Sequence, residues 1–276
     1  MGKMKDLLID QMNQSCPPTK PNILIGIPYT GYTVPIPFIN SLLPALDYSR
    51  QYANITLEFI GHTVTHVARN LLVQAAIRDN SDYIMFIDSD QTFKAESIIE
   101  LLRIAKSNQA DGLAGVYYTR RDYGFPYYNI DPETKRLYPL RAIDYTWQEV
   151  YQCDCIPTGF TLFSRRLFST MPMPLFWYDK RLPDVQLSEV VEHDNETLTL
   201  IDTIANAPLG YGLGEDFQFC YDIWEYNKTT DNPFKIGFAP LIQVGHIGYN
   251  EVGLPMIIQP QEQARGKANP IDIIYN

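Results

Sequence analysis

Residues 83–87 form an apolar run that stops abruptly at two carboxylates, and this junction constrains the fold more than any other feature of the chain. The run follows the polar residues 80–82 and leads directly into Asp88-Ser89-Asp90. A short apolar run bounded by polar residues is typical of a buried strand. Open α/β sheets bind their ligands at the carboxyl ends of such strands. Two carboxylates there suit Mg²⁺ or Mn²⁺, and such a metal in turn suits a pyrophosphate.

Strand-like and helix-like segments alternate over the first half of the chain. Apolar patterning predicts strands at residues 22–28, 55–60, 83–87 and 112–117, with helices at 38–50, 64–77 and 95–105. Pro44 lies inside the first helical segment, so that helix could instead begin there. The alternation predicts an α/β fold with a largely parallel sheet flanked by helices.

Two of these helices have a recognisable apolar face. In the helix at 64–77, the expected inward residues are Val67, Leu71, Leu72, Ala75 and Ala76. In the helix at 95–105, they are Ile98, Leu101, Leu102 and Ala105.

The second half of the chain is less regular. Strands are expected at residues 156–163 and 236–244, and residues 118–147 are expected to form loops with short strands. Residues 172–209 mix prolines, acids and threonines, which favours a mobile insertion over the site. We therefore expect a lead-in at 1–21, a single domain at 22–249 and a tail at 250–276 that acts as a lid.

The charge of the chain argues against two classes of partner. Its net charge is −10 and its pI is near 4.8, which disfavours nucleic acid and anionic membranes. The sequence shows no apolar stretch of membrane-spanning length and no signal peptide at its start. The four cysteines form no Cys-x-x-Cys pair, so they indicate free thiols in a reducing, cytoplasmic compartment.

Adjacent acids open a second chemically suggestive segment, Gly214-Glu215-Asp216. The apolar residues that follow have helical spacing, and acids in a first helical turn are stabilised by the helix dipole. That structural role is one interpretation. The other is a general base, because a carboxylate with a raised pKa can take a proton from an attacking hydroxyl.

A histidine and an arginine complete the candidate groups. His246 lies between glycines after a strand-like run, where an imidazole has room to bind a metal. Arg69 lies early in the helix at 64–77, and its forked guanidinium suits a diphosphate or a carboxylate network. The alternatives are a structural histidine and a surface arginine with a local partner.

Taken in order, these segments resemble a family. Residues 68–70, 83–90, 159–163, 214–217 and 245–248 together look like the nucleotide-sugar glycosyltransferases of the GT-A fold. Their order and spacing resemble family 2-like, non-processive members, including those of phages and other viruses. The resemblance implies a Rossmann-like single domain, with a nucleotide-sugar half at 22–120 and an acceptor half at 121–249. It also implies the host cytoplasm as the location if a virus encodes the chain.

The resemblance also implies a reaction. One sugar, expected to be a hexose, would move from a UDP- or GDP-sugar to a hydroxyl of a carbohydrate or glycosylated acceptor. Mn²⁺ or Mg²⁺ would be the cofactor. In inverting members the base maps onto Asp216, with Glu215 positioning the acceptor.

The implied binding residues fall into three groups. The metal would be held by Asp90 and His246, with Asp88 as a further ligand that lies nearer the ribose. The nucleotide sugar would contact Pro28, Tyr29, Thr30, Arg69, Asp88 and Ser89. The acceptor side would include Thr158 and Gly159.

The chain departs from the family pattern in two places. The acid that many family 2 members place after the second strand is replaced by Ile60-Gly-His-Thr63, which leaves the choice between uridine and guanosine open. The processive Gln-x-x-Arg-Trp signature is absent, which favours transfer of one sugar per encounter. Some retaining enzymes also combine Asp-x-Asp with a late histidine, so the stereochemistry stays open.

Two other functions fit parts of the pattern. Asp88 and Asp90 could be the nucleophile and general acid of a haloacid-dehalogenase-like phosphatase, although that family usually carries the motif on its first strand. A non-catalytic nucleotide- or carbohydrate-binding protein is the second alternative. Tyr117, Tyr118, Trp177 and Tyr178 could stack on sugar faces or fill the core.

Overall fold

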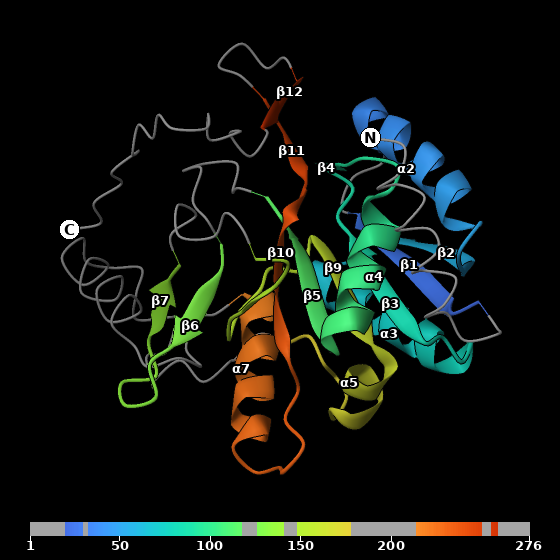
Figure 1. The fold of residues 1–276 in the computed structure, drawn as a ribbon. Helices are drawn as coiled ribbons and strands as arrows, with labels where there is room; N and C mark the ends of the chain where they lie inside the picture. The colour runs from blue at the N-terminus through green and yellow to red at the C-terminus, as the bar shows by residue number, and fades with distance from the viewer. Residues whose placement is uncertain are drawn as a thin grey trace.

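The computed structural model describes residues 20–29, 33–117, 126–140, 148–177, 214–249 and 255–258. Its centre is a seven-stranded sheet with the order β2-β1-β3-β9-β5-β10-β8 (Figure 1). The strands β2, β1, β3, β5 and β10 run parallel, whereas β9 and β8 run against their neighbours. The strand bounds are β1 Asn22–Tyr29, β2 Asn54–Gly61, β3 Tyr83–Ile87, β5 Gly112–Val116, β8 Tyr151–Gln152, β9 Phe160–Ser164 and β10 Ile236–Gln243.

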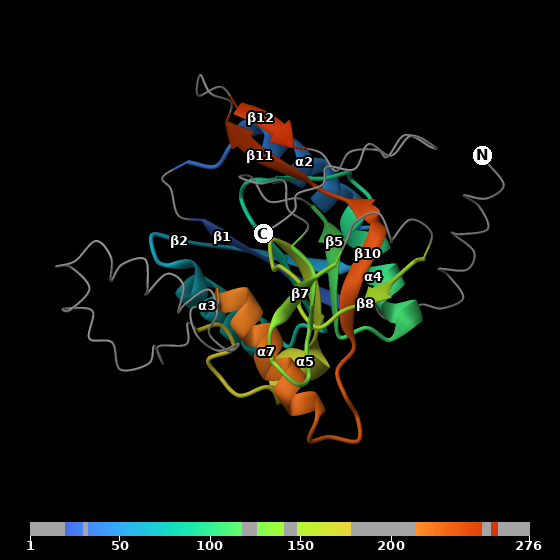
Figure 2. The same cartoon turned by 90° about the vertical axis from the view of Figure 1, so that its left-hand side faces the viewer.

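Helices cover both faces of this sheet (Figures 1 and 2). Helices α2 (Ile36–Ser49) and α4 (Ser97–Asn108) contribute to one hydrophobic cluster. Helices α3 (Thr65–Arg78), α5 (Arg165–Thr170) and α7 (Glu215–Asn227) contribute to the other. The sheet is thus the middle layer of three.

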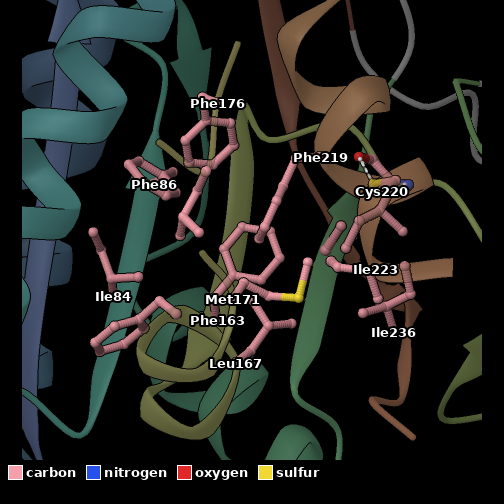
Figure 3. Packing of buried hydrophobic residues seen from close by; sticks show 14 of the residues in the cluster. Ile84, Phe86, Phe163, Leu167, Met171, Phe176, Phe219, Cys220, Ile223 and Ile236 are labelled. Carbon is pink, nitrogen blue, oxygen red and sulfur yellow. Dashed lines mark hydrogen bonds between the residues drawn. The ribbon is translucent and has the colours of Figure 1, made fainter. Parts of the chain in front are cut away.

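Successive side chains of a central strand point to opposite faces of the sheet, and both faces are covered by helices. In β3, Ile84 and Phe86 belong to the cluster under α3 and α7, while Met85 and Ile87 belong to the cluster under α2 and α4. Both faces of the strand are buried, so every position is apolar. Figure 3 shows Phe86, Phe163, Phe176 and Phe219 packed together in the first of these clusters.

Two small sheets lie outside the central one. One has the order β12-β11-β4 and consists of β4 (Gln91–Thr92), β11 (Gly245–Tyr249) and β12 (Pro255–Ile258). The other is the hairpin of β6 (Tyr128–Ile130) and β7 (Leu137–Pro139). The first of them joins the segment after Asp90 to the segment around His246.

The expected mostly parallel sheet with flanking helices is confirmed, but several boundaries differ. Helix α2 begins at Ile36 and contains Pro44, so the alternative start at Pro44 is wrong. Strand β9 begins at Phe160 and not at residue 156, and the Pro157 carbonyl before it accepts a hydrogen bond from the Thr161 hydroxyl. Most of the predicted insertion and tail lies outside the described residues, although residues 255–258 of the tail pair with β11.

The predicted buried face of α3 is partly wrong. Val67 and Leu71 are 37% and 43% exposed, whereas Ala68, Arg69 and Val73 are buried together with Leu72, Ala75 and Ala76. The helix is rotated so that Arg69 points inward to its acidic partners. The predicted inward face of α4 is confirmed, since Ile98, Leu101, Leu102 and Ala105 are all buried.

Candidate functional site

The carboxyl end of β3 turns sharply at Asp88. The Asp88 amide donates to the Gly159 carbonyl at 2.8 Å, which continues the pairing of β3 with β9. The Gln91 amide then donates to the Asp88 carbonyl at 3.1 Å and closes a turn through Ser89 and Asp90. All three residues of this turn are half-buried. The turn presents their side chains at the edge where an α/β sheet binds ligands.

Asp90 and His246 lie side by side although they are far apart in sequence. Strand β4 pairs with β11 so that Gln91 faces His246, and the Ile247 amide donates to the Asp90 carbonyl at 2.7 Å. This register places His246 Nε2 3.4 Å from Asp90 Oδ2. The Tyr117 ring meets the imidazole edge-on, with centroids 5.7 Å apart. A carboxylate and an imidazole therefore converge at the sheet edge.

Arg69 links two further parts of this edge. Its guanidinium is 4% exposed and donates from Nη1 to Glu215 Oε1 at 2.5 Å. Its Nη2 donates to both carboxylate oxygens of Asp88, at 3.1 and 3.3 Å. One arginine thus binds the end of β3 to the start of α7, so the surface-arginine interpretation is wrong.

Burial and charge oppose one another at this guanidinium. Burial lowers the pKa of Arg69, but the carboxylates of Asp88, Asp216 and Glu215 outweigh it, so the net pKa is raised. Arg69 therefore stays charged. Its Nε is buried and makes no hydrogen bond within the described residues.

Asp88 and Asp216, two of the acids near Arg69, are harder to ionise than free carboxyls. Burial raises the pKa of Asp88, with Asp90 adding to the rise and Arg69 opposing it. Burial also raises the pKa of Asp216 to about 6, with Glu215 and Asp88 contributing and Arg69 opposing. Asp216 is the second residue of α7, and its Oδ1 accepts from the Phe217 amide at 2.9 Å. A carboxylate with such a pKa can exchange protons near neutral pH.

Gly159 lies between Asp88 and Tyr117. Its amide donates to the Tyr117 hydroxyl at 2.9 Å, and burial raises the pKa of that phenol well above its usual value. A Cβ at position 159 would meet Tyr117 Oη at 2.6 Å and Asp88 Oδ2 at 2.9 Å. Only glycine fits here. The neighbouring Thr158 is fully buried, and its hydroxyl has no hydrogen-bond partner within the described residues.

The candidate nucleotide residues lie at the ends of β1 and β2. Pro28 is buried, and the Tyr29 ring packs against Phe59 and His62 with centroids 6.5 and 5.9 Å apart. This aromatic cluster of Tyr29, Phe59 and His62 was not predicted from the sequence. Aromatic residues at the ends of two neighbouring strands were the available signal. Thr30 lies outside the described residues, as do Tyr118 and Tyr178.

The structure therefore brings together most of the predicted site residues, in two subgroups. Asp90 contacts His246, while Asp88 and Glu215 contact Arg69. Trp177, which could stack on a sugar or fill the core, donates from Nε1 to Asp222 Oδ2 at 3.0 Å.

The donor chemistry at Asp90 and His246 fits a divalent metal. A carboxylate suits Mg²⁺ or Mn²⁺ and an imidazole suits transition metals, so the pair together favours Mn²⁺ over Mg²⁺. Asp88 is turned toward Arg69. Accordingly, the described part of the chain contains no group of three His, Cys, Asp or Glu residues close enough to bind a metal. Two side chains fit the ion, and phosphate oxygens would have to supply further ligands.

A family model matches the middle part of the chain. Residues 47–171, just under half of the chain, match the family model described as glycosyl transferase family 2. The match runs from the end of α2 past β9 and α5, and so includes Arg69, Asp88, Asp90 and Gly159. The comparison with curated proteins gave no match. Among the described residues, no helix combines the length and apolar character required to cross a bilayer.

The comparison with solved structures also found similar chains. A197 from STIV is 16% identical, with 90% of this chain and 100% of that chain covered and a TM-score of 0.47. GalNAc-T7, solved with UDP, GalNAc and Mn²⁺, is 14% identical, with 83% and 44% covered and a TM-score of 0.47. A glycosyltransferase involved in the glycosylation of the major capsid of PBCV-1 is 15% identical, with 54% and 63% covered and a TM-score of 0.33.

The phosphatase alternative fits this structure poorly. Asp88 follows β3, which is the third strand of the chain, and its carboxylate is bound by Arg69. A nucleophilic aspartate would have to leave that ion pair. Residues 47–171 thus match glycosyl transferase family 2, and the mostly parallel sheet with flanking helices is consistent with a GT-A-like α/β fold.

Proposed function

We propose that the protein transfers one hexose from a nucleoside-diphosphate sugar to a hydroxyl of a carbohydrate or glycosylated acceptor, with inversion and with a bound divalent metal. The observation that carries this proposal is the contact of Asp90 with His246, 3.4 Å apart at the carboxyl edge of the sheet. The proposed donor is a UDP- or GDP-sugar.

Asp90 and His246 would hold the metal, with Mn²⁺ preferred to Mg²⁺ on the grounds of the imidazole ligand. When bound, such an ion acts as a Lewis acid that stabilises the charge developing on a departing diphosphate. Asp88 has a different proposed part. Its carboxylate is held by Arg69 beside Gly159, which orients it as an acceptor for ribose hydroxyls next to Ser89.

Asp216 is the proposed general base. It lies at the amino end of α7, within the field of Arg69, and burial raises its pKa to about 6. It is therefore ionised at neutral pH yet basic enough to accept a proton from an acceptor hydroxyl as that hydroxyl attacks. Its position on the first turn of a helix fixes the direction of its side chain.

Glu215 has a positioning role in this proposal. The resemblance implies that Glu215 positions the acceptor, and its Oε1 accepts from Arg69, which supports a further role in holding that guanidinium. By fixing Arg69, it fixes both Asp88 and the amino end of α7 that carries Asp216. The acceptor side would also include Thr158 and Gly159, which adjoin Asp88 and Tyr117.

The nucleotide base would lie near Pro28, Tyr29 and Thr30. The ring of Tyr29 with those of Phe59 and His62 offers an aromatic surface at the end of β1 and β2. This assignment divides the proposed domain, residues 22–249, into a donor half at 22–120 and an acceptor half at 121–249. Arg69 and Asp88 lie on the donor side, and Asp216 lies on the acceptor side.

The decisive experiment is a thermal-shift panel of UDP-, GDP- and dTDP-sugars with and without Mn²⁺. A ligand that binds only the folded state raises the melting temperature according to its concentration and affinity. We expect one nucleotide class to stabilise the protein in the presence of Mn²⁺ and to do so far less in Asp90→Asn. The matched control is Asp47→Asn, because Asp47 is exposed on α2. Failure of every nucleotide sugar to stabilise the wild-type protein would contradict the proposal.

A further inference from the structure

A second concave site lies away from the carboxyl edge of the sheet. It is a cavity of about 580 Å³ between the later turns of α7, the start of β10, strand β8 and the β6–β7 hairpin. Figures 1 and 2 show α7 and β10 running together toward the edge opposite β11. Its lining residues are Asn129, Ile130, Gln152, Cys153, Asp154, Ile223, Trp224, Asn227, Pro233, Phe234, Lys235 and Ile236.

The cavity is separate from the proposed transfer site. Asp216 is on the first turn of α7, whereas Trp224 and Asn227 are on its last turns. At 1.5 Å of rise per residue, Trp224 lies about 12 Å along the helix axis from Asp216. None of the residues assigned to the metal, donor, acceptor or base lines the cavity.

The wall of the cavity toward the protein interior is apolar. Ile223 and Ile236 belong to the buried cluster between α7 and the sheet, and Figure 3 shows them together at one side of that cluster. Phe234 is also buried. Trp224 is half-buried, with the ammonium of Lys228 over its ring, 3.0 Å from the centroid. Its indole N–H makes no hydrogen bond within the described residues.

The remaining wall carries polar groups that the fold does not use. Asn129 and Gln152 are exposed, and the described residues make no hydrogen bond to either side-chain amide. Asp154 Oδ2 accepts from the Ile130 amide at 2.8 Å, which leaves Oδ1 able to accept further donors. Burial raises the pKa of Asp154, and no cation counters the rise. Asn227 differs, because both ends of its amide bind the backbone of Phe234.

The apolar and polar groups that line this cavity together indicate the class of ligand that it could bind. An indole beside aliphatic residues accommodates the apolar C–H face of a pyranose. Carboxamides donate and accept, and a carboxylate accepts, which matches the dual character of sugar hydroxyls. Lys235 and Asp154 carry opposite charges, so the lining offers no convergent cations for a phosphate group. The volume falls in the range of small-molecule sites, which is about 300–1,000 Å³.

We propose that this cavity is a second, non-catalytic saccharide site, which binds a short neutral glycan through Trp224, Asn129, Gln152 and Asp154. The site would hold a carbohydrate remote from the reacting hydroxyl and keep the enzyme on a glycan-bearing surface. The inference goes beyond the transfer reaction and does not require it, since binding needs neither donor nor metal.

The test is titration of neutral trisaccharides of glucose, galactose, mannose and N-acetylglucosamine into the full chain, followed by calorimetry or ligand-observed NMR. The test variants are the double variant Asn129→Ala with Gln152→Ala, and Trp224→Phe. We expect at least one trisaccharide to bind the wild-type protein and to bind the double variant about tenfold more weakly, since two hydrogen bonds are lost. Gln74→Ala, an exposed amide on α3, is the matched control and should bind like the wild type.

A second arm separates this site from the acceptor site. Binding should be unchanged in Asp216→Asn and unaffected by saturating nucleotide sugar with Mn²⁺. The proposal is overturned if no trisaccharide binds, if the cavity variants bind like the wild type, or if binding disappears in Asp216→Asn. Donor binding is measured on the same samples by thermal shift, so a failure here is distinguishable from failure of the proposed transferase function.

Discussion

Arg69 of α3 and Glu215 of α7, 146 positions apart in the chain, form a buried ion pair with Nη1 and Oε1 at 2.5 Å. The same guanidinium binds Asp88 at the end of β3. Three elements that carry the candidate chemistry are therefore joined at one side chain. The pair matters for function because α7 also carries Asp216 on its first turn.

Removing Glu215 should destabilise the protein strongly. Glu215→Ala leaves Arg69 buried with one fewer anion, and breaking a buried pair in this way typically costs about 3–5 kcal/mol. Glu215→Gln should cost less, because the amide oxygen still accepts from Nη1. The measurement is the free energy of unfolding in urea. The control is Glu100→Ala, whose partner Arg103 is near the surface, and it should cost about 1 kcal/mol or less. Equal losses in the two alanine variants would refute the role given to Arg69.

The pH profile should report Asp216. Because burial raises its pKa to about 6, kcat/KM should fall tenfold per pH unit below about pH 6 and level off above it. Asp216→Asn should lose activity by about a thousandfold or more while retaining donor binding. An acidic limb that persists unchanged in the residual activity of Asp216→Asn would assign the titration to another group.

The raised pKa of Asp216 should also make the stability of the folded protein depend on pH. Its folded-state pKa lies above its ordinary value of 3.8, so the folded protein holds the proton more tightly than the unfolded chain. The resulting stabilisation is complete below about pH 4 and is lost as pH rises through about 6. The melting temperature of Asp216→Asn, measured relative to wild type, should therefore increase between pH 5 and pH 8. A constant difference across that range would contradict the raised pKa.

The sequence predicted the strands, the helices and the acidic residues after β3, because each of these depends on residues that are close together in the chain. The Tyr83–Ile87 run and the helical spacing at 95–105 follow directly from strand and helix periodicity. The contact of Asp90 with His246 was expected only through the family resemblance. It depends on the pairing of β4 with β11, and no local sequence signal specifies that pairing.

Arg69 shows where periodicity fails. The apolar pattern of α3 predicted Val67 and Leu71 to be buried, because it did not allow for a buried charged residue such as Arg69. The acids of Asp88 and Glu215 stabilise the guanidinium inside, so charge pairing between distant segments sets the rotation of the helix. The Tyr29, Phe59 and His62 cluster was missed for the related reason that it joins the ends of two strands.

Metal dependence should follow Asp90 and His246 separately from Asp88. Asp90→Asn and His246→Gln should each raise the Mn²⁺ concentration needed for half-maximal activity by about tenfold or more, since each removes a proposed ligand. Asp88→Asn should chiefly raise KM for the donor, because Arg69 binds its carboxylate and orients it. Mn²⁺ titration of the initial rate for the three variants separates these effects. A larger metal defect in Asp88→Asn than in His246→Gln would reverse the assignment.

Gly61 gives a test of the nucleotide surface without altering any ring. A Cβ at this position would lie 2.1 Å from Cζ of Tyr29, so Gly61→Ala must displace the tyrosine ring from its place beside Phe59 and His62. If that ring contacts the base, KM for the donor should rise about tenfold while kcat changes little, as expected for loss of uniform binding. Tyr29→Ala should show the same pattern. An unchanged donor KM in both variants, with melting temperatures near wild type, would place the base elsewhere on the sheet edge.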